Sequence, residues 1–108
     1  MFGDLMGMMG KLKETQKRVE ATRERLKTVT LETASPDGAL SIVVSADRQV
    51  REIRIAESLM ADKDQLTDYL VTYLNQALAK AGSVHDAEMA ATAREGMPDI
   101  PGMDAFLK

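Results

Sequence analysis

Apolar and polar residues alternate in three short segments between residues 28 and 56. The apolar positions of this alternation are Val29, Leu31, Leu40, Ile42, Val44, Ile53 and Ile55. A period of two places successive side chains on opposite faces of a strand, so each segment is expected to bury one face. The sequence therefore predicts a three-stranded antiparallel sheet with one apolar face that other elements must cover.

Two turn-sized breaks separate these strands. Residues 35–38 read Ser-Pro-Asp-Gly, in which proline presets φ and glycine tolerates a positive φ, so the first two strands should form a hairpin. Residues 47–49 read Asp-Arg-Gln and contain no glycine, so they indicate a turn without defining its geometry.

A long first helix is predicted for residues 5–27, which contain no proline. Leu5, Leu12, Val19 and Leu26 recur every seven residues, while the positions that would complete a coiled-coil seam are polar. About 22 helical residues span roughly 33 Å, whereas strands of six or seven residues span about 20–23 Å. The helix should extend past its sheet, and the narrow apolar row favours cover by a second copy of the chain. The predicted dimer interface comprises Leu5, Met9, Leu12, Val19, Leu26, Leu40, Ile42 and Val44.

A second amphipathic helix is predicted after the sheet. Asp62 and Gln65 have the spacing of a capping box, and apolar residues then recur every three or four positions up to Ala81. That face is broad enough to cover a sheet. Gly82 and Ser83 are expected to end or kink the helix.

The C-terminal part of the chain carries weaker signals. Residues 84–95 are alanine-rich and are expected to extend the helix with little tertiary support. Residues 96–103 contain two prolines and two glycines, which predicts an irregular segment. We therefore expect one domain, residues 1–95, followed by a tail, residues 96–108.

Charge is unevenly distributed along the 108 residues. The formal net charge is −3, yet residues 11–27 contain seven cations and only three acids. The chain has no cysteine and a single histidine, His85, which excludes disulfides and a histidine or thiolate metal cluster. Uncharged apolar runs are too short to cross a bilayer, and the first residues lack the basic region of a secretory signal, so a cytoplasmic protein is expected.

One face of the first helix combines cations with hydroxyls. At 100° per residue, a set of hydrogen-bond donors falls within an arc of roughly 80°, about a quarter turn from the apolar row. Its members are Lys11, Thr15, Arg18, Thr22 and Arg25. No carboxylate lies inside this arc, and such a face is suited to phosphate oxygens. The alternative is an ordinary solvated charged face.

Other polar residues offer no catalytic arrangement. His85 has no nucleophile elbow or oxyanion loop in the sequence to work with. Asp62, Asp64 and Asp68 do not follow a calcium-loop pattern, and helix capping accounts for them. No enzyme, cofactor, metal or small-molecule substrate is expected.

In its order of segments the chain resembles the YbaB/EbfC family of bacterial nucleoid-associated proteins. The matching segments are residues 1–3 (Met-Phe-Gly), 38–44 (Gly-Ala-Leu-Ser-Ile-Val-Val), 50–55 (Val-Arg-Glu-Ile-Arg-Ile), 58–66, 74–81 and 96–103. They cover nearly the full chain. The sequence departs from the family pattern at Ala56-Glu57, where Asp-Pro is common, and at residues 46–48, which lack the usual glycine.

The resemblance implies an α+β subunit of order α-β-β-β-α, an intertwined homodimer joined through sheets and helices, and binding of double-stranded DNA with little sequence preference. It implies DNA contacts on the first helix. Together with the hydroxyls of the donor arc, the predicted DNA-binding residues are Lys11, Lys13, Thr15, Lys17, Arg18, Thr22, Arg23 and Arg25.

Two classes of function follow. The first is a non-enzymatic, nucleoid-associated, dimeric DNA-binding protein. The second is a dimeric scaffold that engages another protein through its methionine-rich start and its Pro/Gly tail, with the basic helix serving solubility. The residues alone do not separate them, and the resemblance favours the first.

Overall fold

The computed structural model describes residues 2–95 and the side chains from residue 4 onward. Its elements are α1 (Phe2–Leu26), β1 (Thr30–Ala34), β2 (Leu40–Ser45), β3 (Gln49–Ile55), α2 (Glu57–Met60) and α3 (Lys63–Glu95). The three strands form one antiparallel sheet in the order β1-β2-β3. The predicted α-β-β-β-α arrangement of an α+β fold is thus confirmed. The predicted tail lies outside the described residues.

The hairpin turn between β1 and β2 forms as its sequence predicts. The N–H of Gly38 donates to the carbonyl of Ser35 at 2.9 Å, and Gly38 adopts φ 72°. Inside the turn, Asp37 Oδ1 accepts hydrogen bonds from the Ser35 hydroxyl (2.6 Å) and the Ala39 N–H (3.1 Å). The Tyr69 hydroxyl of α3 donates to Asp37 Oδ2 at 2.8 Å, so this carboxylate ties the turn to α3.

These hydrogen bonds predict a pH dependence of stability. The Ser35 hydroxyl, the Tyr69 hydroxyl and the Ala39 N–H hold the pKa of Asp37 below its usual value. A carboxyl with a lowered folded-state pKa stabilises the fold above its unfolded pKa of about 3.9, and that contribution is lost as the pH falls through the folded pKa. Asp37→Asn should therefore melt below the wild type at pH 7, and the two melting temperatures should converge at acid pH. Thermal melts between pH 7 and pH 2 measure this; an offset that is the same at every pH would contradict it.

The turn between β2 and β3 contains a left-handed backbone conformation that its sequence did not predict. Arg48 adopts φ 66°, in the left-handed region, and its N–H donates to the carbonyl of Ser45 at 2.9 Å. A β-bulge between Val43 and Val44 shifts the register just before this turn. An arginine thus occupies a position whose positive φ favours glycine.

The core lies between β2 and α3. Leu40, Ile42 and Val44 are fully buried and contact Ala77 and Ala81 of α3. These three β2 side chains were predicted at a dimer interface; within one chain α3 already covers them and leaves them no exposed surface. Alternation identifies the buried face of a strand but not the element that buries it.

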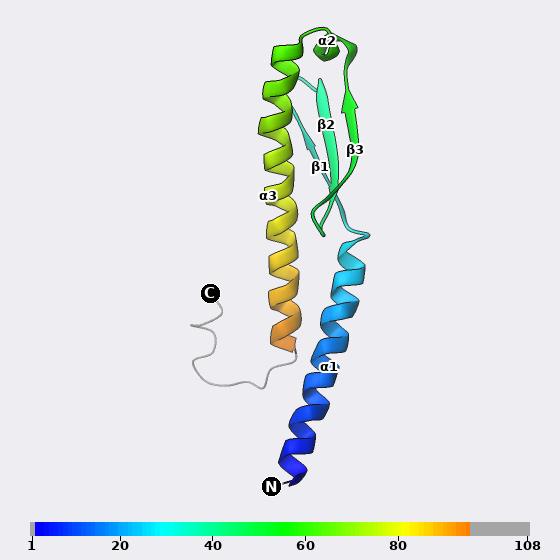
Figure 1. The fold of residues 1–108 in the computed structure, drawn as a ribbon, viewed down its shortest axis with the longest axis vertical. Coiled ribbons are helices and arrows are strands. Elements are labelled where there is room, and N and C mark those ends of the chain that lie inside the picture. The colour runs from blue at the N-terminus through cyan, green and yellow to red at the C-terminus, as the bar shows by residue number, and fades with distance from the viewer. Residues whose placement is uncertain (1, 96–108) are drawn as a thin grey trace.

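The sheet is covered unevenly. α3 contacts β1 and β2, whereas β3 lies at the sheet edge away from it (Figure 1). Ile53 pairs with Ile42 across the two strands but remains 41% exposed, and Val50 is 44% exposed. The apolar face therefore continues onto β3 without cover from α3.

α3 runs without interruption from Lys63 to Glu95. The expected end or kink at Gly82 and Ser83 is wrong. Gly82 is buried, and a methyl group on it would lie 3.2 Å from two nitrogens of the Arg48 guanidinium. The glycine accommodates a neighbouring side chain instead of breaking the helix. At the other end, the Gln65 N–H donates to Asp62 Oδ1 at 3.1 Å, which confirms Asp62 as the cap.

α1 projects away from the sheet (Figure 1). It packs against the second half of α3, and its first half continues past the end of α3. The molecule measures 71 × 26 × 16 Å and has a radius of gyration of 20.1 Å, against about 13 Å for a compact chain of this size. The first helix extends past the sheet as predicted, but it does not lie along the sheet, because it packs against α3 instead.

Candidate nucleic-acid interface

The C-terminal half of the predicted donor arc faces α3. Thr22 is 7% exposed, and its hydroxyl oxygen lies 2.7 Å from that of Thr92. Three residues further on, Arg25 Nη2 lies 2.7 Å from Glu88 Oε2, and one turn earlier Arg18 Nη1 donates to the Glu95 carbonyl at 3.0 Å.

These contacts bear on three of the predicted DNA-binding residues. Thr22 is buried between two helices of one chain, so its hydroxyl faces Thr92 and not solvent. Arg18 and Arg25 remain exposed, but each shares its charge or donors with α3. The arc itself contains no carboxylate, but α3 brings Glu88, more than 60 residues away in the sequence, against Arg25.

The buried threonine pair predicts a non-additive effect on stability. The Thr92 hydroxyl donates to the Glu88 carbonyl at 2.9 Å, so within the pair its oxygen accepts from the Thr22 hydroxyl. Thr22→Val removes this one hydrogen bond and should lower the free energy of unfolding by about 1 kcal/mol. Replacing Thr92 by Val as well cannot remove the same hydrogen bond twice, so the double variant should lose less than the sum of the two single losses. Urea denaturation of the two single variants and the double variant measures the coupling; strictly additive losses would contradict it.

The projecting half of α1 carries three exposed lysines, Lys11, Lys13 and Lys17. Within residues 2–95 their ammonium groups form no ion pair. Thr15 donates its hydroxyl to the Lys11 carbonyl at 2.9 Å, so only its lone pairs and methyl group face outward. The lysines are thus the free cations of this segment.

The predicted apolar row of α1 divides in the same way. Leu26 is fully buried at the base of the helix, and Val19 is half-buried. Leu5, Met9 and Leu12 lie on the projecting half and are 63%, 55% and 62% exposed. Within one chain, contacts with other elements bury only the C-terminal end of this apolar row.

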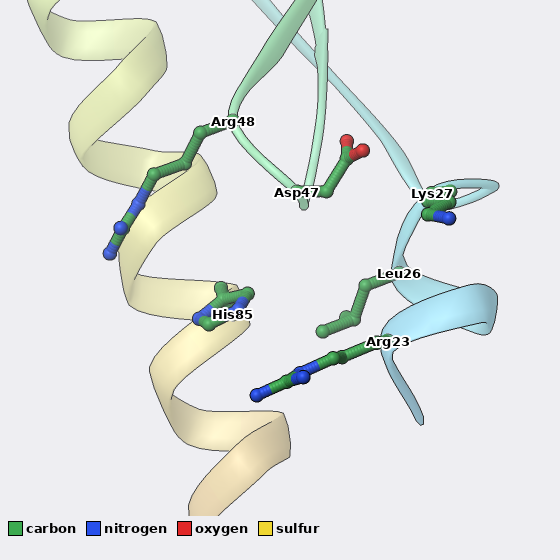
Figure 2. A pocket seen from close by; sticks show the side chains of 6 residues that line it. All are labelled: Arg23, Leu26, Lys27, Asp47, Arg48 and His85. Atoms are coloured by element: carbon green, nitrogen blue, oxygen red, sulfur yellow. The ribbon is translucent and has the colours of Figure 1, made fainter. Parts of the chain in front are cut away.

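Arg23 lies in a pocket that the sequence did not predict (Figure 2). The pocket has a volume of about 200 Å³ and is lined by Arg23, Leu26, Lys27, Asp47, Arg48 and His85. The Lys27 ammonium lies 2.9 Å from Glu24 Oε1, and this hydrogen bond raises the pKa of Lys27 above its usual value.

Arg48 and His85 are the residues that sequence reasoning missed. Both belong to elements remote from the first helix, and neither stands in a motif. A signal existed for Arg48, since an arginine occupies a turn in which glycine is expected. For His85 the sequence offers no signal.

Among residues 2–95, no cluster of three or more histidine, aspartate or glutamate side chains has a geometry that could hold a metal ion. In the same range, no helix has the length and apolarity that a membrane span requires.

Comparison with known proteins supports a relation over the whole chain. A nucleoid-associated protein of Flavobacterium johnsoniae is 55% identical over 105 residues, which cover 97% of this chain and 99% of that protein. A nucleoid-associated protein of Bordetella avium is 33% identical over 104 residues, or 95% of each chain. The crystal structure of an uncharacterized Helicobacter pylori protein shares the fold, with a TM-score of 0.62 at 21% identity, over 70% of this chain and 90% of that one.

The sequence model of the YbaB/EbfC DNA-binding family matches residues 1–97, which include α1, the sheet and all of α3. The chain belongs to the YbaB/EbfC DNA-binding family.

Proposed function

We propose that this protein is a non-enzymatic, homodimeric nucleoid-associated protein that binds double-stranded DNA through phosphate contacts from α1, with little sequence preference. Its place of action is the nucleoid, in the bacterial cytoplasm. The observation that carries the proposal is the projecting part of α1, where three lysines without an ion pair lie at or beyond the end of α3. Family membership and the names of the relatives support it.

The angular positions of the lysines suit a helix lying in a groove. At 100° per residue, Lys13 and Lys17 lie about 40° apart, whereas Lys11 lies about 160° from Lys13. The major groove of B-DNA is about 12 Å wide and admits one helix. Lysines on opposite sides of that helix reach phosphates on opposite walls of the groove, and such contacts position a protein without reading bases.

A homodimer accounts for the apolar surface that one chain leaves open. Leu5, Met9 and Leu12 on α1 and Val50 and Ile53 on β3 are all more than 40% exposed. A dimer would bury apolar groups of this kind and present two basic helices to one duplex. Sedimentation equilibrium should yield twice the 11.8 kDa mass of one chain; a monomer at micromolar concentration would contradict the dimer.

The test of DNA binding is fluorescence anisotropy of a random duplex titrated with protein over a series of salt concentrations. Three lysines from each protomer make six phosphate contacts, and each contributes about −0.9 to the slope of log K against log salt, so we expect about −5. Duplexes of different base composition should bind alike, and the matching single strand should bind more weakly. Absence of binding at 50 mM salt would refute the proposal.

A second function is favoured by one observation. Met6, Met8 and Met9 on the projecting helix are 74%, 65% and 55% exposed, and flexible methionines suit an adaptable protein-binding surface. The alternative is a dimeric scaffold that captures a protein through this patch and residues 96–108. Under that function, replacing Met6 and Met8 by serine abolishes capture and leaves DNA affinity unchanged.

A further inference from the structure

The pocket at the base of α1 is built by three separate parts of the chain (Figure 2). Arg23 comes from α1, Arg48 from the turn between β2 and β3, and His85 from α3. Lys27 follows the end of α1, and Leu26, fully buried, forms an apolar floor. Arg23 reaches across the pocket toward α3 and His85, while the Arg48 side chain crosses α3 and directs its guanidinium away from Arg23.

Two locally unfavourable features accompany the position of Arg48: a positive backbone φ and a glycine in the interior of the neighbouring helix. Its backbone has φ 66°, which disfavours any residue with a Cβ atom. Opposite it, α3 carries Gly82 in its interior, where glycine lowers helix stability. A methyl group at residue 82 would lie 3.2 Å from both Nε and Nη2 of Arg48. A strained arginine and a helical glycine thus meet at one guanidinium, and such local violations are typical of functional positions.

The acids near the pocket are already engaged. Asp47 accepts a hydrogen bond from the Ser45 hydroxyl, and its Oδ2 lies 3.7 Å from Arg51 Nη2. Asp86 Oδ1 lies 3.5 Å from Arg48 Nη2 and 3.1 Å from His85 Nδ1. Glu24 pairs with Lys27, as described above.

Arg23 differs from these groups because it has no hydrogen-bonding or ionic partner within residues 2–95. Its guanidinium presents a planar fork of N–H donors, which matches a tetrahedral oxyanion. The second ring nitrogen of His85, Nε2, is also left for a ligand, since Asp86 occupies Nδ1.

We propose that this pocket binds one phosphate group. Arg23 donates to two of its oxygens, the Arg48 guanidinium adds positive charge beside α3, and the His85 ring, whose Nδ1 faces Asp86, lines the site. The phosphate belongs either to a DNA backbone or to a free phosphate or phosphate monoester. The site is separate from the lysines of the projecting helix and does not depend on them.

The first test uses His85, the single histidine of the chain, as a reporter. The full-length protein is titrated with inorganic phosphate at constant pH and constant ionic strength, with chloride as the balancing anion, and the ring signals are followed by NMR. We expect a saturable shift of the His85 signals. Arg23→Gln and Arg48→Gly should each weaken phosphate binding at least 10-fold, whereas Arg54→Gln, an exposed arginine on β3, should leave it unchanged.

Stability separates binding from a structural role. Glycine relieves the positive φ at residue 48, so Arg48→Gly should keep or raise the melting temperature while losing phosphate. A parallel titration of duplex DNA separates the two sources of phosphate. If Arg23→Gln weakens duplex binding more than Arg54→Gln does, the site takes a backbone phosphate; if only inorganic phosphate is lost, it takes a free one.

The proposal is overturned if phosphate moves the His85 signals no more than chloride does and the duplex affinity of Arg23→Gln equals that of Arg54→Gln. These readouts are independent of the projecting lysines, so failure of the phosphate pocket and failure of the proposed DNA function are distinguishable.

Discussion

Replacing Lys11, Lys13 and Lys17 together by glutamine is expected to weaken binding of a random duplex by about 100-fold or more at 0.1 M salt. Each phosphate contact contributes close to tenfold at this salt concentration through the release of one counterion, and a dimer loses up to six contacts. The slope of log K against log salt should flatten from about −5 toward zero. Anisotropy titrations of the variant and the wild type at four salt concentrations measure both effects.

A charge-matched control makes this test specific. Arg54, Lys63 and Lys80 are exposed on β3 and α3, away from the projecting helix. Their triple replacement by glutamine removes the same number of charges from each chain. It should lower the affinity less than tenfold and preserve most of the slope. Equal losses in the two triple variants would show that total charge, and not the projecting helix, determines binding.

Ile42→Ala is expected to lower the free energy of unfolding by about 2–5 kcal/mol, the usual range when a fully buried isoleucine is truncated. Ile42 is 0% exposed on the central strand and packs in the cluster beneath α3. A domain of this size has only about 5–15 kcal/mol of stability in total. The variant should therefore unfold at a much lower urea concentration, which circular dichroism measures at a fixed protein concentration.

The cross-strand partner Ile53 is an internal control, because it is the same residue type in the neighbouring strand. At 41% exposure within one chain, Ile53→Ala should cost less than Ile42→Ala. Any further loss that grows as the protein is diluted would report cover of β3 by a second copy. Equal losses for the two variants, independent of concentration, would contradict the placement of Ile42 in the core and Ile53 outside it.

Much of this fold follows from patterns that extend over only a few residues. The alternation around Ile42 and the Ser-Pro-Asp-Gly turn predict the hairpin, because strand faces and turn geometry are set by adjacent residues. The heptad row and the absence of proline predict the long first helix. The order of elements was therefore accessible from the sequence.

Which element faces which was less accessible. Strand alternation marks Ile42 as buried but does not say whether a helix of the same chain or a second copy covers it. The angular position of Thr22 on the first helix likewise does not reveal that Thr92 lies opposite. Both questions concern residues 35 to 70 positions apart, and packing across such separations leaves little trace in a local pattern.

Arg48 and Gly82 illustrate the same limit at the pocket. In the sequence each is an exception, an arginine where a turn favours glycine and a glycine within a helical segment. Only the folded chain shows that the two exceptions are neighbours. Lys11, Lys13 and Lys17 could be identified without knowledge of distant contacts, because no other described element packs against the part of the first helix that carries them.

The way α1 is attached has a mechanical consequence. Leu26 anchors its base in apolar surroundings, whereas further out the helix is held to α3 by the polar contacts of Thr22, Arg25 and Arg18. Water can replace the exposed contacts of Arg18 and Arg25 at modest cost, whereas the buried Leu26 and Thr22 resist displacement. The base of α1 is therefore held more firmly than the part of the helix that contacts α3 through Arg18 and Arg25. Lys11, Lys13 and Lys17 lie far from this base, so a small rotation of the helix about its base would move them by several ångströms relative to the sheet.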